Sequence, residues 1–151
     1  AYSKKIVGYN LSESLSTLGS LKALRMAKQN RIYPHQELIH HSDRGIQYCS
    51  DSYQQHLKRY HMKCSMTESY DPYANAVAER VNGILKDEFS INEYNLSLKD
   101  MQKLIRDTIN LYNEKRPHAS CGYHTPNFMH QQNRVKIKTY KKVQANELAW
   151  T

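Results

Sequence analysis

Strand-like and helix-like segments alternate along this chain, and the alternation limits the folds that it can adopt. Three short β-rich segments are predicted to be strands: residues 4–11, 37–43 and 62–66. Helices are predicted between them, over residues 15–31 and about 51–60, and Ser50 or Asp51 can cap the second. Such an alternation predicts an α/β fold with a largely parallel sheet, in which functional groups lie just beyond the carboxyl ends of the strands.

Two further helices are predicted in the second half of the chain. The first spans about Ala76 to Phe89 and follows a loop rich in Ser, Asp, Pro and Asn. Its apolar residues gather on one side, which can pack on the sheet: Val77, Val81, Ile84, Leu85 and Phe89. The second helix begins at Ser97, which forms a capping-box-like pair with Asp100, and it ends at Pro117.

The chain is basic, which favours an anionic partner. Its 151 residues suffice for one hydrophobic core, so we expect one domain. A formal net charge of +8 favours nucleic acid or a membrane surface, although a solvated basic face would have the same composition. The sequence contains no signal-peptide core and no run of about eighteen apolar residues, so we expect a soluble, cytoplasmic protein without a membrane partner.

The cysteines and histidines favour neither a disulfide framework nor a soft-metal site. Cys49, Cys64 and Cys121 are odd in number and form no close pair, so we expect free thiols. The eight histidines lack the spacing of metal ligands.

The polar side of the predicted helix 76–89 presents a carboxylate, an amide and an ammonium group. Glu79, Asn82 and Lys86 recur at helical spacing and therefore share this side. Any amphipathic surface helix has such a side, so the pattern alone does not indicate a site. A second acid changes the interpretation, because Asp43 lies at the end of a predicted strand, where functional groups gather in α/β proteins.

Three stretches resemble the integrase core of bacterial insertion-sequence transposases, which are relatives of retroviral integrases. They are HHSDRGIQYCS from residue 40, NAVAERVNGILKDEF from residue 75 and YNEKRPHASCGYHTP from residue 112. Asp43 precedes Glu79 at the spacing of this family. The resemblance covers roughly residues 1–130 and implies a ribonuclease H-like three-layer sandwich. Residues 116–118 and 125–126 match family positions with mainly structural roles.

The resemblance implies a metal-dependent site for cutting and joining DNA. Asp43 matches the family's second catalytic aspartate and Glu79 its catalytic glutamate, so both are expected to bind metal. Two Mg2+ (or Mn2+) ions would complete the site, because they can activate an oxygen nucleophile and neutralise the leaving oxygen. Lys86 matches the lysine that approaches the DNA end near the reacting phosphate. Further candidate DNA contacts are Asn82, Arg44 and Arg80.

One departure from the family bears on activity. In the family the first catalytic aspartate lies on the first strand, and a second strand leads into a segment that resembles residues 1–9. This chain begins at that segment. We therefore expect the C-terminal portion of a transposase core without its first two strands, inactive by itself and with an unpaired sheet edge beside Asp43.

The predicted core at residues 1–130 is followed by a basic tail at residues 131–151. Lys136 and Lys138 lie in a stretch with five basic residues and no acid, Arg134–Val143, which could follow DNA phosphates. A disordered solubilising tail is the alternative for this segment.

The sequence thus predicts part of a transposase that cuts and joins DNA ends. The expected partners are transposon ends and target duplex, bound by a homo-oligomer that associates with the nucleoid on DNA. A catalytically dead remnant that binds DNA or intact transposase subunits is an alternative. A ribonuclease of the same fold is a third possibility, because a fold does not fix its substrate.

Overall fold

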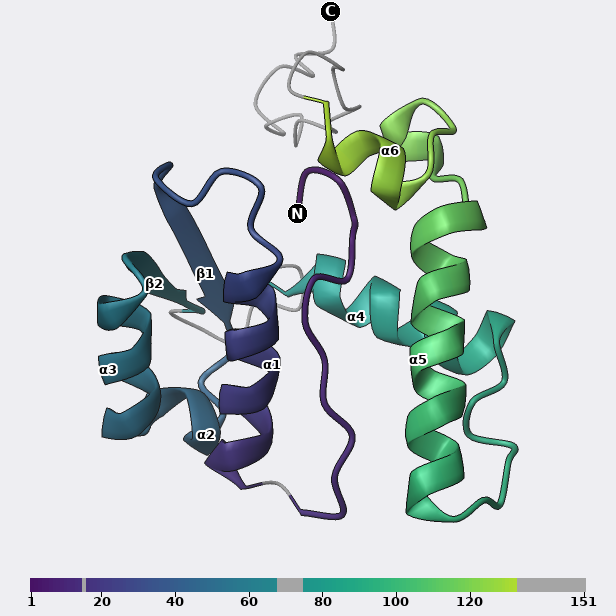
Figure 1. Cartoon of the computed structure of the whole chain (residues 1–151), viewed down its shortest axis with the longest axis horizontal. Helices are drawn as coiled ribbons and strands as arrows, with labels where there is room; N and C mark the ends of the chain where they lie inside the picture. The colour runs from purple at the N-terminus through teal and green to yellow at the C-terminus, as the bar shows by residue number, and fades with distance from the viewer. Residues whose placement is uncertain (15, 68–74, 133–151) are drawn as a thin grey trace, which may run out of the picture.

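The fold is seen in a computed structural model that describes residues 1–14, 16–67 and 75–132 (Figure 1). Two groups of elements lie on either side of an N-terminal segment, residues 1–14, which runs between α1 and α5 (Figure 1). The predicted basic stretch with Lys136 and Lys138 lies outside the described residues. Among the described helices, none has the length and apolar character needed to cross a membrane.

The first group contains the sheet. Its elements are α1 (Thr17–Gln29), β1 (Leu38–Ser42), α2 (Ile46–Cys49), α3 (Asp51–Arg59) and β2 (Met62–Met66). The strands β1 and β2 are parallel, with Leu38 opposite Met62 and Ser42 opposite Met66. Parallel neighbours need a crossover connection, and α2 and α3 supply it. The α/β prediction is therefore confirmed for this half of the chain.

A small apolar core fixes the sheet to its helices. Leu24 of α1, Tyr53 and Leu57 of α3, and Met62 of β2 are all buried in one cluster. Burying side chains of this kind contributes roughly 1.5–3 kcal/mol each. Ser50 is the N-cap of α3, since its hydroxyl accepts the Tyr53 N–H at 3.3 Å, as predicted.

The second group is helical. Its elements are α4 (Ala76–Gly83), the π-helical turn η1 (Ile84–Glu88), α5 (Leu98–Lys115), the 3-10 turn η2 (Ala119–Cys121) and α6 (Pro126–His130). The predicted cap of α5 is confirmed, because the Ser97 hydroxyl accepts the Asp100 N–H at 3.2 Å. The helix predicted over residues 76–89 is present, but its last turn is π-helical, which the sequence pattern did not predict.

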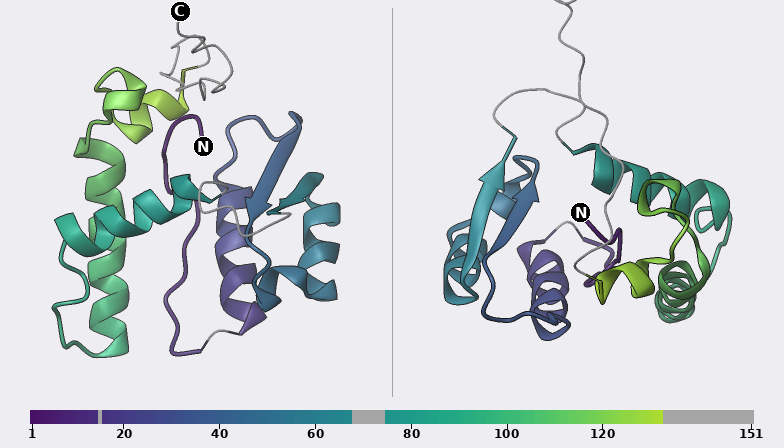
Figure 2. Two further views of the ribbon diagram at one scale, coloured as in Figure 1. Left: turned by 180° about the vertical axis from the view of Figure 1, so that it is seen from behind. Right: turned by 90° about the horizontal axis from the view of Figure 1, so that it is seen from above.

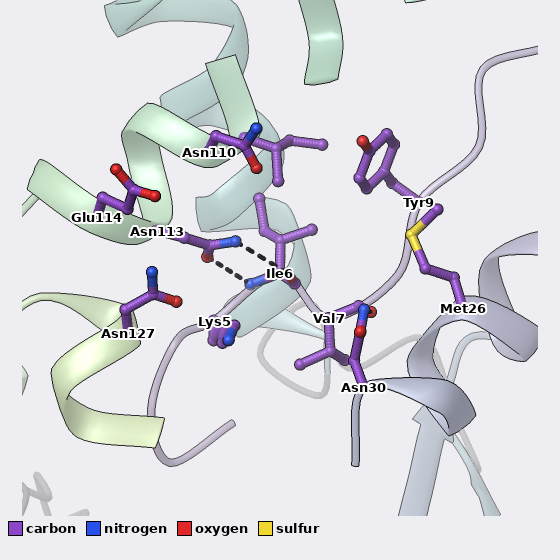
Figure 3. A pocket seen from close by; sticks show the side chains of 11 residues that line it. Lys5, Ile6, Val7, Tyr9, Met26, Asn30, Asn110, Asn113, Glu114 and Asn127 are labelled. Carbon is purple, nitrogen blue, oxygen red and sulfur yellow. Dashed lines mark hydrogen bonds between the residues drawn. The ribbon is translucent and has the colours of Figure 1, made fainter. Parts of the chain in front are cut away.

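The predicted strand at residues 4–11 is wrong, because the structure assigns no strand there. Side chains, not a neighbouring strand, bond to several of its backbone groups. The Asn113 side-chain amide both accepts the Ile6 N–H and donates to the Ile6 carbonyl, each at 3.0 Å (Figure 3). The Tyr112 hydroxyl donates to the Lys4 carbonyl at 2.8 Å. β propensity reflects packing beside another strand, so a β-rich segment without such a neighbour stays irregular.

The apolar side of α4 does not pack on the sheet, contrary to the prediction. Val77 is 40% exposed, and of the described residues in α4 and η1 only Ile84 is buried. This side instead faces a pocket of about 560 Å³ that is also lined by Lys4, Tyr123 and residues 116–120.

One edge of the described sheet is open, as predicted. Among the residues that the structure describes, β1 pairs with β2 alone, so the other edge of β1 has no strand beside it. Leu38 and Ile39 are exposed on β1, and Ile39 reaches 61% exposure. Unpaired backbone groups and exposed apolar side chains at an edge favour addition of another strand.

The double hydrogen bond of Asn113 predicts a stability effect. Asn113→Ala leaves the Ile6 N–H and carbonyl without these bonds and should lower the free energy of unfolding by about 1–3 kcal/mol. Urea denaturation followed by circular dichroism measures the change. Asn110→Ala is the control, because Asn110 is exposed on the same helix and should change stability by less than about 0.5 kcal/mol. Equal losses in both variants would show that the Asn113 bonds contribute nothing specific.

Candidate active site

Asp43 directly follows β1 and is exposed at the carboxyl end of the sheet. Its Oδ1 accepts the Gly45 N–H at 3.0 Å, which directs the carboxylate back over the turn. The turn is tight at Gly45, because a Cβ there would lie 3.0 Å from Asp43 Oδ1 and would displace the end of the Gln47 side chain, whose Nε2 lies 2.6 Å away. A backbone bond and a tight turn therefore fix the direction of the Asp43 side chain.

An aromatic cluster anchors the strand that carries Asp43. The Tyr53 hydroxyl and His40 Nε2 are 3.0 Å apart, and the centroids of these two rings are separated by 5.5 Å. Tyr48 adds a second edge contact to Tyr53 at 5.3 Å. Burial lowers the pKa of His40 and raises the pKa of Tyr53, so both groups are held neutral. Asp43 is thus exposed at the end of a strand that is held by the contacts of His40 with Tyr53.

Arg44 links the ends of the two strands. Its Nε donates to the Thr67 carbonyl at 2.8 Å, and the Thr67 N–H donates to the Ser42 carbonyl at 3.2 Å. The structure thus gives this predicted DNA contact a structural bond as well, while the side chain remains exposed.

Glu79 lies in the first turn of α4 and is exposed. Its N–H donates to the Asn75 carbonyl at 3.1 Å, and the helix dipole favours a carboxylate in this turn. Figures 1 and 2 show that α4 begins on the side of the sheet and runs toward α5. Glu79 therefore lies at the end of α4 that is nearer the strands.

The three other candidate residues of this helix are exposed with Glu79. Asn82 lies in α4 and Lys86 in η1, while Arg80 is 71% exposed and its Nη2 is 3.8 Å from Glu88 Oε1. Among the described residues, no group of three or more His, Cys, Asp or Glu side chains is arranged to hold a metal ion. The described site thus offers two separate acids, Asp43 and Glu79, with basic residues beside each.

Sequence reasoning missed an ion pair next to these residues. Arg116 Nε and Nη2 donate to Glu88 Oε2 and Oε1 at 2.7 and 2.6 Å. The hydrogen bond from Arg116 lowers the pKa of Glu88, and the same bond raises that of Arg116. Glu88 sits in a recognised motif, but no local signal pairs it with an arginine in another helix. The resemblance to the family implied only a general structural role for Arg116.

A second pocket, of about 290 Å³, contains none of the predicted site residues (Figure 3). It lies between the N-terminal segment, α1 and α5, and it is rich in asparagine: Asn30, Asn110, Asn113 and Asn127. Two of the amides bond to the N-terminal segment, since Asn30 Nδ2 donates to the Val7 carbonyl at 2.9 Å and Asn113 bonds to Ile6. These amides therefore support the fold.

The architecture is shared with solved integrase cores. The catalytic core domain of BIV integrase aligns with a TM-score of 0.60 and 19% identity, over 79% of this chain and 73% of that one. The HTLV-2 integrase catalytic core domain, solved in complex with magnesium, aligns with a TM-score of 0.58 and 20% identity, over 80% and 75%. The fold is therefore the ribonuclease H-like fold of integrase catalytic cores.

Sequence comparison gives the family. Two family models described as Integrase core domain match residues 1–72 and 60–126. Transposase InsF for insertion sequence IS3fB, from Escherichia coli (strain K12), is 33% identical over 133 residues, which cover 87% of this chain and 46% of that protein. This chain belongs to the integrase core family. It spans about half the length of the curated relatives that it matches.

The histidine beside Arg116 predicts a pH dependence of stability. Burial, and then the charge of Arg116, lower the pKa of His118 from 6.5 to about 4. Between the pKa of His118 in the unfolded chain, 6.5, and its pKa of about 4 in the folded chain, the unfolded chain binds a proton that the folded chain does not. The free energy of unfolding is therefore highest above pH 6.5 and decreases as the pH falls toward 4. The melting temperature should drop between about pH 7 and pH 5, and His118→Gln should reduce the drop.

The matched control for this measurement is His35→Gln, since His35 is exposed in a loop. His40 and His130 also have pKa values lowered by burial, so the drop should be reduced and not abolished. Parallel curves for wild type and His118→Gln would contradict the assignment.

Proposed function

We propose that this chain forms part of the catalytic core of a DNA transposase, which cuts DNA ends and joins them by metal-dependent transesterification. One observation carries the proposal. In a chain of the integrase core family, an exposed aspartate follows a parallel strand, and an exposed glutamate lies in the first turn of α4, which starts on the side of the sheet (Figure 1). These are Asp43 and Glu79, and we assign them as the catalytic, metal-binding acids.

The two acids fit a hard divalent cation. Mg2+ prefers carboxylate oxygens and water, and Mn2+ accepts the same ligands. One oxygen of Asp43 accepts a single backbone N–H, and a carboxylate has about four lone-pair sites, so Asp43 can still coordinate a cation. Both acids are exposed, which leaves them accessible to an ion and to DNA. We propose two such ions in the complete site, held in part by Asp43 and Glu79.

Divalent ions supply activation of the oxygen nucleophile and neutralise the charge that develops on the leaving oxygen. The protein's own contribution is positioning. The bond from Gly45 holds the Asp43 carboxylate at the end of β1, and the first turn of α4 carries Glu79. In phosphoryl transfer, positioning and charge stabilisation account for most of the catalysis.

The basic residues around these acids are suited to DNA phosphates. Lys86 and Asn82 are exposed on the helix that carries Glu79, while Arg44 follows Asp43. Arg80 is also exposed, and a net charge of +8 favours a polyanion. We propose that these residues contact transposon ends and target duplex, that a homo-oligomer assembles on DNA, and that this places the protein at the nucleoid.

We also propose that the basic tail at residues 131–151 continues this contact beyond a core at residues 1–130. Lys136 and Lys138 would add phosphate contacts without base specificity.

The first prediction for this function concerns the acids. In a full-length transposase that carries these residues, Asp43→Asn or Glu79→Gln should lower strand transfer by about a hundredfold or more, because each change removes a metal-binding charge at nearly constant volume. A strand-transfer assay with labelled transposon ends measures it, and DNA binding should be retained. Asp51→Asn is the control, since Asp51 is an exposed acid at the start of α3. Near-wild-type transfer in either site variant would reject the two-acid assignment.

A further prediction concerns Lys86. If Lys86 contacts a phosphate, Lys86→Gln should weaken DNA binding and lower the slope of log K against log salt by about one. Fluorescence anisotropy over a salt titration measures the slope. Lys22→Gln on α1 removes one exposed charge elsewhere and should leave the slope unchanged. Equal slopes for wild type and Lys86→Gln would make Lys86 an ordinary surface residue.

A further inference from the structure

The helix that carries Glu79 has little apolar packing to fix its orientation. Among the described residues of α4 and η1, Ile84 is the single buried one, and Val77 is 40% exposed. A helix with so few buried side chains is weakly restrained against rotation about its axis, since most helical stability in proteins comes from a packed face. Glu79 and Lys86 need another source of orientation if they are to meet one DNA end.

A two-point ion pair supplies such a restraint. Both oxygens of Glu88 accept bonds from Arg116, at 2.6 and 2.7 Å, and the guanidinium also donates to the Pro117 carbonyl at 3.2 Å. Paired bonds between a guanidinium and a carboxylate fix an angle as well as a distance. Glu88 ends the π-helical turn that contains Lys86. Holding Glu88 therefore restrains Lys86 directly and Glu79 through the continuous helix.

The arginine itself is firmly placed. Arg116 is the C-cap residue of α5, and its side chain is 20% exposed. Tyr112, one turn earlier, is fully buried and bonds to the Lys4 carbonyl. The His118 ring packs edge-on against Tyr112 at a centroid distance of 5.4 Å. The ion pair thus joins η1 to the end of α5, next to the buried Tyr112.

The π-helical turn η1 also supports a role in orienting this helix. π-helical turns are rare, occur mostly within α-helices and are frequent at functional sites. Here it comes directly after the helix that carries Glu79 and Asn82, and its last residue is the one bound by Arg116. The turn and the ion pair together decide which side of the helix Lys86 occupies.

We propose that Glu88 and Arg116 are positioning residues, whose ion pair sets the rotation of the α4–η1 helix and thereby directs Glu79 and Lys86 toward the DNA end. This inference rests on the proposed function of those two residues. Exposed ion pairs commonly contribute little to stability, so the effect is on orientation more than on unfolding. Glu37 and Lys63 form such an ordinary pair, 2.6 Å apart and more than half exposed, and they provide the control.

The first experiment is hydrogen exchange of the isolated chain, measured by mass spectrometry. Arg116→Lys keeps the positive charge but removes the paired N–H donors of the guanidinium. Glu88→Gln keeps the side-chain shape but removes the negative charge. Each should speed exchange in residues 79–88 by about tenfold and leave β1 and α3 unchanged. Lys63→Gln should change neither region. Unchanged exchange in residues 79–88 of both variants would overturn the proposal.

The second experiment is a double-mutant cycle on DNA affinity with Lys86→Gln. Glu88→Gln removes a negative charge and by simple electrostatics should tighten DNA binding, so a weakening of about threefold or more would indicate a misdirected Lys86. Adding Glu88→Gln or Arg116→Lys to Lys86→Gln should then cause no further loss. Additive effects of Arg116→Lys and Lys86→Gln would overturn the positioning role.

The two proposals can fail separately. If Lys86→Gln does not change the salt slope, the DNA-contact function of Lys86 is rejected, while the exchange experiment still decides whether the ion pair orders the helix. If Lys86→Gln changes the slope but Glu88→Gln and Arg116→Lys change neither slope nor exchange, the positioning role alone is rejected.

Discussion

The last two turns of α5 hold the second half of the molecule together through polar bonds. Tyr112 and Asn113 bind the backbone of the N-terminal segment at Lys4 and Ile6, and Arg116 binds Glu88 at the end of η1. Tyr112 and Arg116 are one helical turn apart and therefore lie close together, with Asn113 next to Tyr112 in the sequence. The N-terminal segment and the α4–η1 helix therefore both take their positions from α5.

The two candidate acids are supported by different physics. Asp43 follows a strand that is bonded to a neighbouring strand and packed through His40 on Tyr53, so its position comes from hydrogen bonding and burial. Glu79 lies in α4, where no described residue is fully buried, so its position depends more on directional polar contacts. A helix that presents charges to a polyanion has to keep one side exposed to solvent. Hydrogen bonds and ion pairs then supply part of the orientation that a packed apolar face would otherwise give.

Local patterns predicted the elements whose signals are local. The caps at Ser50 and Ser97, the strand before Asp43 and the helix that begins at Ala76 were all found from spacing and residue type. The strand predicted at residues 4–11 failed because a strand needs a neighbour, and the structure places the amide of Asn113 there.

The candidate acids were predicted from a sequence motif. The contacts that support them could not be predicted in this way. A motif names residues that do chemistry, whereas the pairing of Glu88 with Arg116 depends on how two helices meet. The π-helical turn was equally hidden, since its residues also fit an α-helical pattern. What the sequence left open is thus the set of long-range polar bonds that orient the predicted residues.

Those polar bonds also make the orientation of the α4–η1 helix sensitive to acid. The bond from Arg116 lowers the pKa of Glu88, so the pair is intact above the usual carboxyl range and is lost as pH falls through that lowered value. His118 takes up a proton near pH 4, which places a second positive charge beside Arg116. Both changes weaken the contacts that restrain the α4–η1 helix. On the Asp43 side, protonation of His40 would place a charge in a buried site beside Tyr53. Acid therefore weakens the support of both candidate acids, through the Glu88–Arg116 pair on the Glu79 side and through His40 on the Asp43 side.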